Sequence, residues 1–242
     1  MVQRANSRQA ACGGLPVKDK PVIITAAEVA AAIKGDAPND ELVRLIRDSP
    51  EQSHGLLEQL SRDRDPVVRA WVPPVARTVL RKDAVPLIIR MAREDRDVDV
   101  RDVAIEELLE LDRDAARSMV PLFRKKLRSS DPFEPLTAMW ALAAVGDEGA
   151  VDLIRAKIAG RQPNALDRMN GEVVIMLLTN LSEILRRIRD HDHDRMLMLS
   201  KAAALMGTHE AVEALRACAD RAPDSQCREN CREDLERLKA HD

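Results

Sequence analysis

Part of this 242-residue chain occurs twice. The stretch that begins at Ala141 and the stretch that begins at Ala202 align without a gap, at an offset of 61 residues. Alanine, glycine, Ala-Val and Arg-Ala stand at equivalent positions in the two copies. An offset of this size holds two units of about thirty residues, and a pair of helices with two turns fits each unit. The internal match therefore predicts a series of similar helix pairs.

Weaker copies of the same pattern lie upstream. Val85-Pro86-Leu87 and Val120-Pro121-Leu122 are 35 residues apart, and Val151 follows Val120 by 31. Each of these valines stands where a second helix would open. Asp65-Pro-Val-Val-Arg69 and Asp97-Val-Asp-Val-Arg101 are 32 residues apart, and each would open a first helix. The spacing stays close to one helix pair along much of the chain.

The composition favours helices throughout. Apolar residues make up 45% of the chain, but aromatic residues only 2%, and we find none of the short alternating runs that form β-sheets. Thr25 to Glu28 form a capping box, and Asp65-Pro66 and Asp131-Pro132 place a cap before a first-turn proline. These signals predict helices at about 26–34, 40–48, 50–61, 66–80, 83–93, 98–111, 113–128, 132–145, 147–160, 171–189, 193–206, 208–220 and 224–239.

The short links between these helices make neighbours antiparallel, and the repetition favours a superhelix over a closed bundle. We therefore expect an all-α fold, an α-solenoid of antiparallel helix pairs. A single domain would span residues 21–242, after a flexible leader at 1–20. The charged helix at 224–239 would cap its C-terminal end.

An Asp-capped first helix with Val-Arg one turn later, a turn centred on glycine, and a second helix that opens with Ala-Val together resemble the HEAT-like repeats of phycobilisome-lyase type. The resemblance covers residues 62–220 and is best at 62–160 and 193–220. Residues 161–192 depart from the pattern, with a longer helix and no Val-Arg pair. The resemblance implies a scaffold or adaptor, since only a few proteins with such repeats are enzymes.

A basic stripe is the main candidate binding site. Arg124, Arg155 and Arg216 each stand four residues after the valine of a second helix, and Lys125, Lys126, Arg128 and Lys157 would broaden the stripe. If the second helices line a concave inner face, as in HEAT-like solenoids, a protein partner with an acidic segment would follow these side chains.

The same arginines have a simpler interpretation as ordinary helix-surface ion pairs. Asp152 precedes Arg155 by three residues, and Glu213 precedes Arg216 by three. The sequence favours this second interpretation, in which the stripe is a solvated face.

Other candidate sites have weak support. His209-Glu210 is similar to the His-Glu motif of deoxyhypusine hydroxylase, a di-iron HEAT-repeat enzyme, but the chain has a single such pair. The run 191–194 alternates histidine and aspartate, and we interpret it as a polar turn rather than a metal site. Trp71 and Trp140 invite comparison with HEAT-like alkylpurine DNA glycosylases, but we expect both to be packing residues.

Three cysteines lie near the end of the chain: Cys218, Cys227 and Cys231. A zinc site would need a fourth ligand, for which His209 and His241 are loose candidates. Cys218 paired with Cys227 or Cys231 would instead join the last two helices. We expect reduced, buried thiols in preference to either arrangement.

The net charge of the chain and the absence of known catalytic motifs from its sequence bear on its function. The net charge of -3 argues against a dedicated nucleic-acid-binding protein, which usually carries a basic surplus. We find no phosphate-binding loop, catalytic triad motif or membrane span. We therefore expect a non-catalytic cytoplasmic scaffold without a cofactor. The alternatives are a DNA-repair protein and a metal-dependent repeat enzyme.

Overall fold

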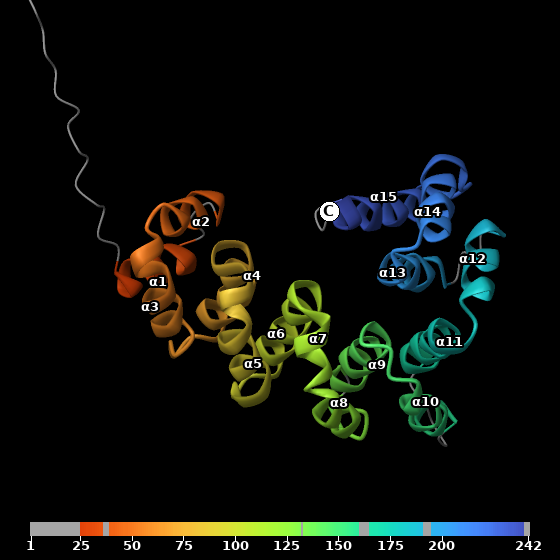
Figure 1. Cartoon of the computed structure of the whole chain (residues 1–242), viewed down its shortest axis with the longest axis horizontal. Coiled ribbons are helices and arrows are strands. Elements are labelled where there is room, and N and C mark those ends of the chain that lie inside the picture. The colour runs from red at the N-terminus through yellow and green to blue at the C-terminus, as the bar shows by residue number, and fades with distance from the viewer. Residues whose placement is uncertain (1–24, 36–38, 132, 160–164, 191–194, 240–242) are drawn as a thin grey trace, which may run out of the picture.

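The computed structural model describes residues 25–35, 39–131, 133–159, 165–190 and 195–239. Helices packed one after another in chain order form a curved row (Figure 1), and the described residues contain no strand. The α-helices are α1 Ala26–Lys34, α2 Asn39–Arg47, α3 Pro50–Leu60, α4 Pro66–Leu80, α5 Val85–Glu94, α6 Val98–Leu111, α7 Arg113–Arg117, α8 Val120–Lys126, α9 Glu134–Ala144, α10 Val151–Ile158, α11 Ala165–Thr179, α12 Leu181–Arg189, α13 Met196–Met206, α14 His209–Arg221 and α15 Ser225–Lys239. Two 3₁₀ turns, η1 Arg81–Ala84 and η2 Glu148–Ala150, precede α5 and α10.

The row has an inner and an outer side. In Figure 1, α4, α6, α9 and α11 follow the inner side of the curve, and α5, α8 and α10 lie on its outer side. The inner helices pack directly against one another in sequence, whereas each outer helix packs on an inner one: α5 on α6, α8 on α9 and α10 on α11. Beyond α11, the helices α13 and α15 turn back across from α6 and α9 on the inner side.

Three predicted helix starts carry the caps that their sequences suggest, whereas α9 begins only at Glu134, and Asp131 accepts hydrogen bonds from the N–H groups of Phe133 and Glu134. Thr25 and Glu28 form the capping box, with Glu28 N–H donating to Thr25 Oγ1 and Thr25 N–H to the Glu28 carboxylate. Asp65 and Asp97 cap α4 and α6 by accepting from the second helical N–H. An arginine stands four residues after each capping aspartate. Its guanidinium donates to the backbone carbonyl of the residue two positions before that aspartate. The two arginines are Arg69, which bonds to Asp63 O, and Arg101, which bonds to Asp95 O.

The two stretches that match at an offset of 61 residues share their local structure. In both, a helix ends just before a glycine whose backbone is left-handed: Gly146 with φ of 69° and Gly207 with φ of 61°. Glycine adopts this conformation without the clash that a Cβ would cause. A second helix follows each turn, and the matched Ala-Val pair lies at its start: Ala150 is the N-cap and Val151 the first residue of α10, whereas Ala211 and Val212 lie in the first turn of α14.

Two predicted helices are each divided in the structure. The predicted 113–128 helix is split at Ser118-Met119 into α7 and α8, because Pro121 has no backbone N–H and is accommodated only in a first turn. The predicted 171–189 helix is split at Asn180, which has an extended backbone and accepts a hydrogen bond from Ser182. The irregular region around 161–192 therefore contains two helices, α11 and α12, rather than one long helix.

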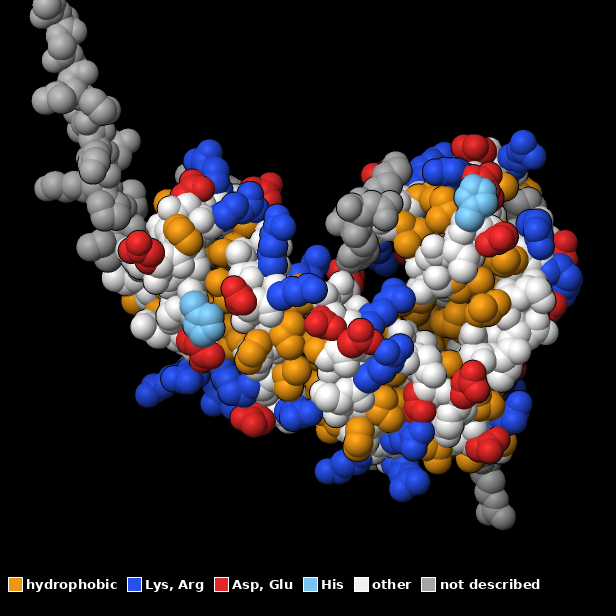
Figure 2. All heavy atoms as spheres, viewed as in Figure 1, with side chains coloured by type: hydrophobic (Ala, Val, Ile, Leu, Met, Phe, Trp, Pro, Cys, Tyr) orange, Lys and Arg blue, Asp and Glu red, His pale blue; other side chains and the backbone are white. Residues whose placement is uncertain are grey.

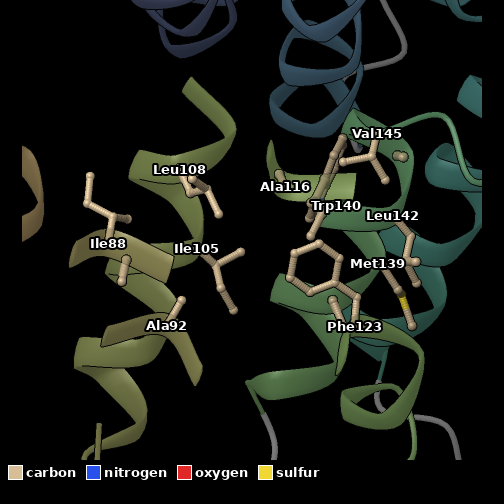
Figure 3. Packing of buried hydrophobic residues seen from close by; sticks show 14 of the residues in the cluster. Ile88, Ala92, Ile105, Leu108, Ala116, Phe123, Met139, Trp140, Leu142 and Val145 are labelled. Atoms are coloured by element: carbon tan, nitrogen blue, oxygen red, sulfur yellow. The ribbon is translucent and has the colours of Figure 1, made fainter. Parts of the chain in front are cut away.

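The core is a continuous layer of small and branched side chains between the helices. Figure 3 shows its middle part, where Phe123 of α8 and Met139 and Leu142 of α9 lie together, beside Ile105 and Leu108 of α6. None of the helices in the described part of the chain combines the length and apolarity needed to cross a bilayer.

Candidate interaction surfaces

Except for Arg216 of α14, the residues of the predicted basic stripe lie on α8, directly after it, or on α10, on the outer side of the row. Arg124 and Lys125 belong to α8, Arg155 and Lys157 to α10, and Arg216 to α14. Because α8 and α10 follow the outer side of the curve, their exposed side chains are opposite the inner position that we expected for second helices (Figure 1). The stripe and the inner face are therefore two separate surfaces.

Each of the three predicted arginines has a carboxylate partner. Arg155 pairs with Asp152 at 3.3 Å and Arg216 with Glu213 at 2.7 Å, as the surface interpretation predicts. Arg124 instead reaches the next turn of the chain, where Nε and Nη2 donate to the two oxygens of Asp147 at 2.8 and 2.6 Å. Gly149 makes room for this pair, since a Cβ there would stand 2.6 Å from Arg124 Nη2.

A groove of about 980 Å³ opens between the outer helices, and we call it the outer basic groove. Figure 2 shows Lys and Arg side chains gathered on the outer edge of the molecule over α8. Of the predicted stripe residues, Arg124, Lys125, Lys126 and Arg128 line the groove, whereas Arg155, Lys157 and Arg216 do not. Its lining residues are Arg93, Arg101, Val120, Pro121, Leu122, Arg124, Lys125, Lys126, Arg128, Ser129, Glu134, Gly149, Asp152 and Leu153.

Glu134 organises the buried part of this groove. Lys126 Nζ, which is itself buried, lies 2.8 Å from Glu134 Oε1 and 3.0 Å from Asp102, and Arg101 donates to Glu134 at 3.0 Å. Burial alone would raise the pKa of Glu134, but hydrogen bonds from Lys126, Ser129 and Arg101 outweigh it and hold the pKa at about 2. Lys126 and Arg101 therefore form ion pairs with carboxylates of this chain.

Three other cations of the groove form no ion pair within the described part of the chain. Arg93, Lys125 and Arg128 are exposed and form no ion pair with any residue that the structure describes. Arg93 is not among the stripe residues predicted from the sequence. The signal was present, because the offset of 35 that superimposes Val85 on Val120 also superimposes Arg93 on Arg128.

A second hollow lies on the inner side, where α13 and α15 face α6 and α9, and we call it the inner cleft. Two adjoining cavities of about 440 and 540 Å³ form it, and they share Leu109, Glu110, Lys201, Leu205 and Arg237. The first adds Leu111, Arg113, Ala204, Gly207, Asp234 and Leu238, and the second adds Glu106, Phe133, Leu136, Thr137, Trp140, Ala144 and Asn170.

Aromatic side chains concentrate in the inner cleft. Phe133 and Trp140 are two of the four aromatic residues in the chain, and the Phe133 residue is 60% exposed. Trp140 is nearly buried and fixed from two sides, since its Nε1–H donates to Asn170 Oδ1 at 2.7 Å and Lys201 Nζ lies 5.1 Å from its ring centroid. Trp140 thus links α9 to α11 and α13.

A disulfide joins the last two helices, one of which contributes to this cleft. Cys218 of α14 and Cys231 of α15 form a disulfide, whereas we expected reduced thiols. Burial of both residues against the α14–α15 contact brings them into bonding range. Cys227 is buried outside the disulfide, and burial raises the pKa of its thiol. Because α15 contributes Asp234, Arg237 and Leu238 to the cleft, the disulfide fixes part of its wall.

The remaining predicted sites stay apart. His209 and Glu210 begin α14, where Thr208 caps the helix, and no group of three or more His, Cys, Asp or Glu side chains suited to a metal exists among the described residues. Residues 191–194 and His241 lie outside the described part of the chain. Trp71 belongs to α4 and Trp140 to α9, and only Trp140 lines the inner cleft.

Comparison with known proteins adds no relative. No protein-family model matches the chain, and no curated protein matches it either.

Proposed function

We propose that this chain is a HEAT-like α-solenoid that acts as a non-catalytic scaffold and binds an apolar segment of a protein partner in its inner cleft. The observation that carries the proposal is Phe133, a largely exposed aromatic side chain beside Trp140 in an open cleft. Aromatic residues in such hollows commonly supply much of the binding energy of protein interfaces. The contacts that recur at offsets of 32 and 61 residues support the repeat architecture.

The charges at the rim of the inner cleft favour an amphipathic helix as the bound segment. Glu106 and Glu110 lie one turn apart on α6, and Lys201 and Arg237 face them from α13 and α15. Between these acidic and basic walls lie Leu109, Leu136 and Leu205. A helix with an apolar face and opposite charges along its two edges would match this arrangement.

Site-specific photo-crosslinking in cells of the source organism tests the proposal. A photoreactive amino acid at Phe133 is expected to capture a discrete protein adduct. The matched control is Leu197 of α13, an apolar residue that is 59% exposed and lies outside the cleft. Leu205→Glu, which charges the floor of the cleft, should abolish the Phe133 adduct. Equal adducts at Phe133 and Leu197, or an adduct that survives Leu205→Glu, would contradict the proposal.

A further inference from the structure

We infer that the outer basic groove is a second binding site, which takes an acidic polypeptide segment with closely spaced carboxylate or phosphate groups. The proposal rests on Arg93, Lys125 and Arg128, which converge on one groove from α5 and from α8 and the turn after it. It is independent of the inner cleft, because the groove lies on the opposite side of the row.

The other cations of the groove are held by carboxylates of this chain. Arg124 pairs with Asp147, and Lys126 and Arg101 share Glu134. These pairs fix the walls and satisfy their own charges, so they have little capacity for a ligand. The three cations without a partner among the described residues are left to attract an anion from outside.

The shape and chemistry of the groove fit oxyanions on a chain. Arg93 and Arg128 each present a planar guanidinium, which donates two parallel hydrogen bonds to one carboxylate or phosphate. Lys125 adds a point charge on the same surface. The apolar side chains of Val120, Leu122 and Leu153 supply the floor, against which the aliphatic parts of a peptide would pack.

The surroundings favour an acidic polypeptide over nucleic acid. A duplex binds through many phosphate contacts spread over a broad basic face. Here three cations without an ion pair among the described residues converge in one groove, the exposed carboxylate of Asp152 stands at its edge, and the whole chain has a net charge of -3. A short segment placed inside the groove would meet all three cations together, whereas a duplex would extend beyond them.

Fluorescence anisotropy on the full-length protein tests the site. Labelled oligoglutamate and a labelled peptide with two phosphoserines are the probes, and an oligoglutamine peptide is the uncharged reference. Both anionic probes should bind at low ionic strength and weaken with added salt. The triple variant Arg93→Gln, Lys125→Gln, Arg128→Gln should weaken the tighter probe about tenfold, since three exposed charge contacts are removed. The ratio between the two probes distinguishes carboxylate from phosphate as the preferred group.

A matched variant separates the groove from general electrostatics. Arg44→Gln, Arg47→Gln, Arg221→Gln removes the same charge from exposed arginines that also lack an ion pair within the described residues. It should leave probe binding unchanged, and far-UV circular dichroism should show that both triple variants are folded. The proposal is overturned if neither anionic probe binds, if both triple variants weaken binding equally, or if duplex DNA binds more tightly than either probe and depends on the groove residues.

Discussion

The outer basic groove contains a partly buried carboxylate, Glu134, and the inner cleft a buried one, Asp234, and their pKa shifts are opposite. In the groove, Lys126, Ser129 and Arg101 hold the pKa of Glu134 at about 2 despite its burial. In the cleft, burial raises the pKa of Asp234, and its bond to Ser200 and its position near Arg237 only partly offset that rise. The same kind of side chain is therefore stabilised in its charged form on one side of the row and penalised on the other.

This difference reflects how the two surfaces are built. On the outer side, ion pairs join α8 to its neighbours: Lys126 pairs with Glu134 of α9, and Arg124 pairs with Asp147 in the turn before α10. The inner helices pack directly, Trp140 lies in the cleft wall, and the disulfide fixes α15, which contributes other residues to that wall. Charge should therefore control the groove, and apolar packing should control the cleft.

The largest effect is expected from Trp140→Ala. It removes a large, nearly buried ring together with its hydrogen bond to Asn170 and its contact with Lys201, so unfolding should become easier by about 4 kcal/mol. Urea denaturation measures the change. Phe133→Ala is the control, because this exposed side chain should leave the free energy of unfolding within about 0.5 kcal/mol. Comparable losses for both variants would show that the cleft is a packed core rather than an open surface.

Loss of the disulfide should be next in size. Cys218 and Cys231 are separated by 13 residues, and a crosslink over a loop of this length stabilises by about 3 kcal/mol. Cys231→Ser should lower the stability of the oxidised protein and raise hydrogen exchange in α15 and α14. Anionic peptide binding in the outer basic groove should stay unchanged. The expected difference between the cleft and the groove would be contradicted if hydrogen exchange rose equally in α8, or if Cys231→Ser caused no loss of stability under oxidising conditions.

Much of the helix layout was predictable from the sequence because its signals are local. The Thr25 capping box, the Asp65 and Asp97 caps and the left-handed Gly146 and Gly207 each depend on a few neighbouring residues. The same is true of the pairs Asp152–Arg155 and Glu213–Arg216, whose spacing alone brings them together on a helix.

The surfaces were harder to predict because they depend on the curvature of the row. Curvature places α8 and α10 outside, and it brings Lys201 and Arg237 across from Glu110. The spacing of residues along the sequence does not show which of these helices and side chains come to face one another. The partner of Arg124 also escaped prediction, since Asp147 is 23 residues away and reaches it only through the turn before α10.

Glu134→Gln tests whether the ion pairs of Glu134 in the outer basic groove stabilise the protein. A carboxylate with a folded-state pKa of about 2 stabilises the protein above its ordinary pKa near 4.5, and this contribution disappears as the pH falls towards 2. The variant should therefore lose about 2 kcal/mol at pH 7 and progressively less below pH 4. Urea titrations at several pH values measure the difference. Glu183→Gln is the control, since the pKa of Glu183 is also about 2 but its ion pairs lie on the surface and should contribute little. A Glu134→Gln deficit that stayed constant with pH would mean lost packing rather than lost charge.

Asp234→Asn should give the smallest change, with the opposite sign. Because the folded state raises the pKa of Asp234, the folded protein holds this proton more tightly than the unfolded chain, and the stability it contributes falls as the pH rises through that raised value. Asparagine keeps an acceptor for Ser200 but carries no charge, and the ion pair it gives up is with the exposed Arg237. The variant should match wild type below about pH 3 and exceed it by less than about 1 kcal/mol at pH 7. An Asn variant that is less stable than wild type at neutral pH would show that ionised Asp234 is held as favourably as Glu134. The groove and the cleft would then differ in the types of side chain that line them, but not in how favourably each holds a charged carboxylate.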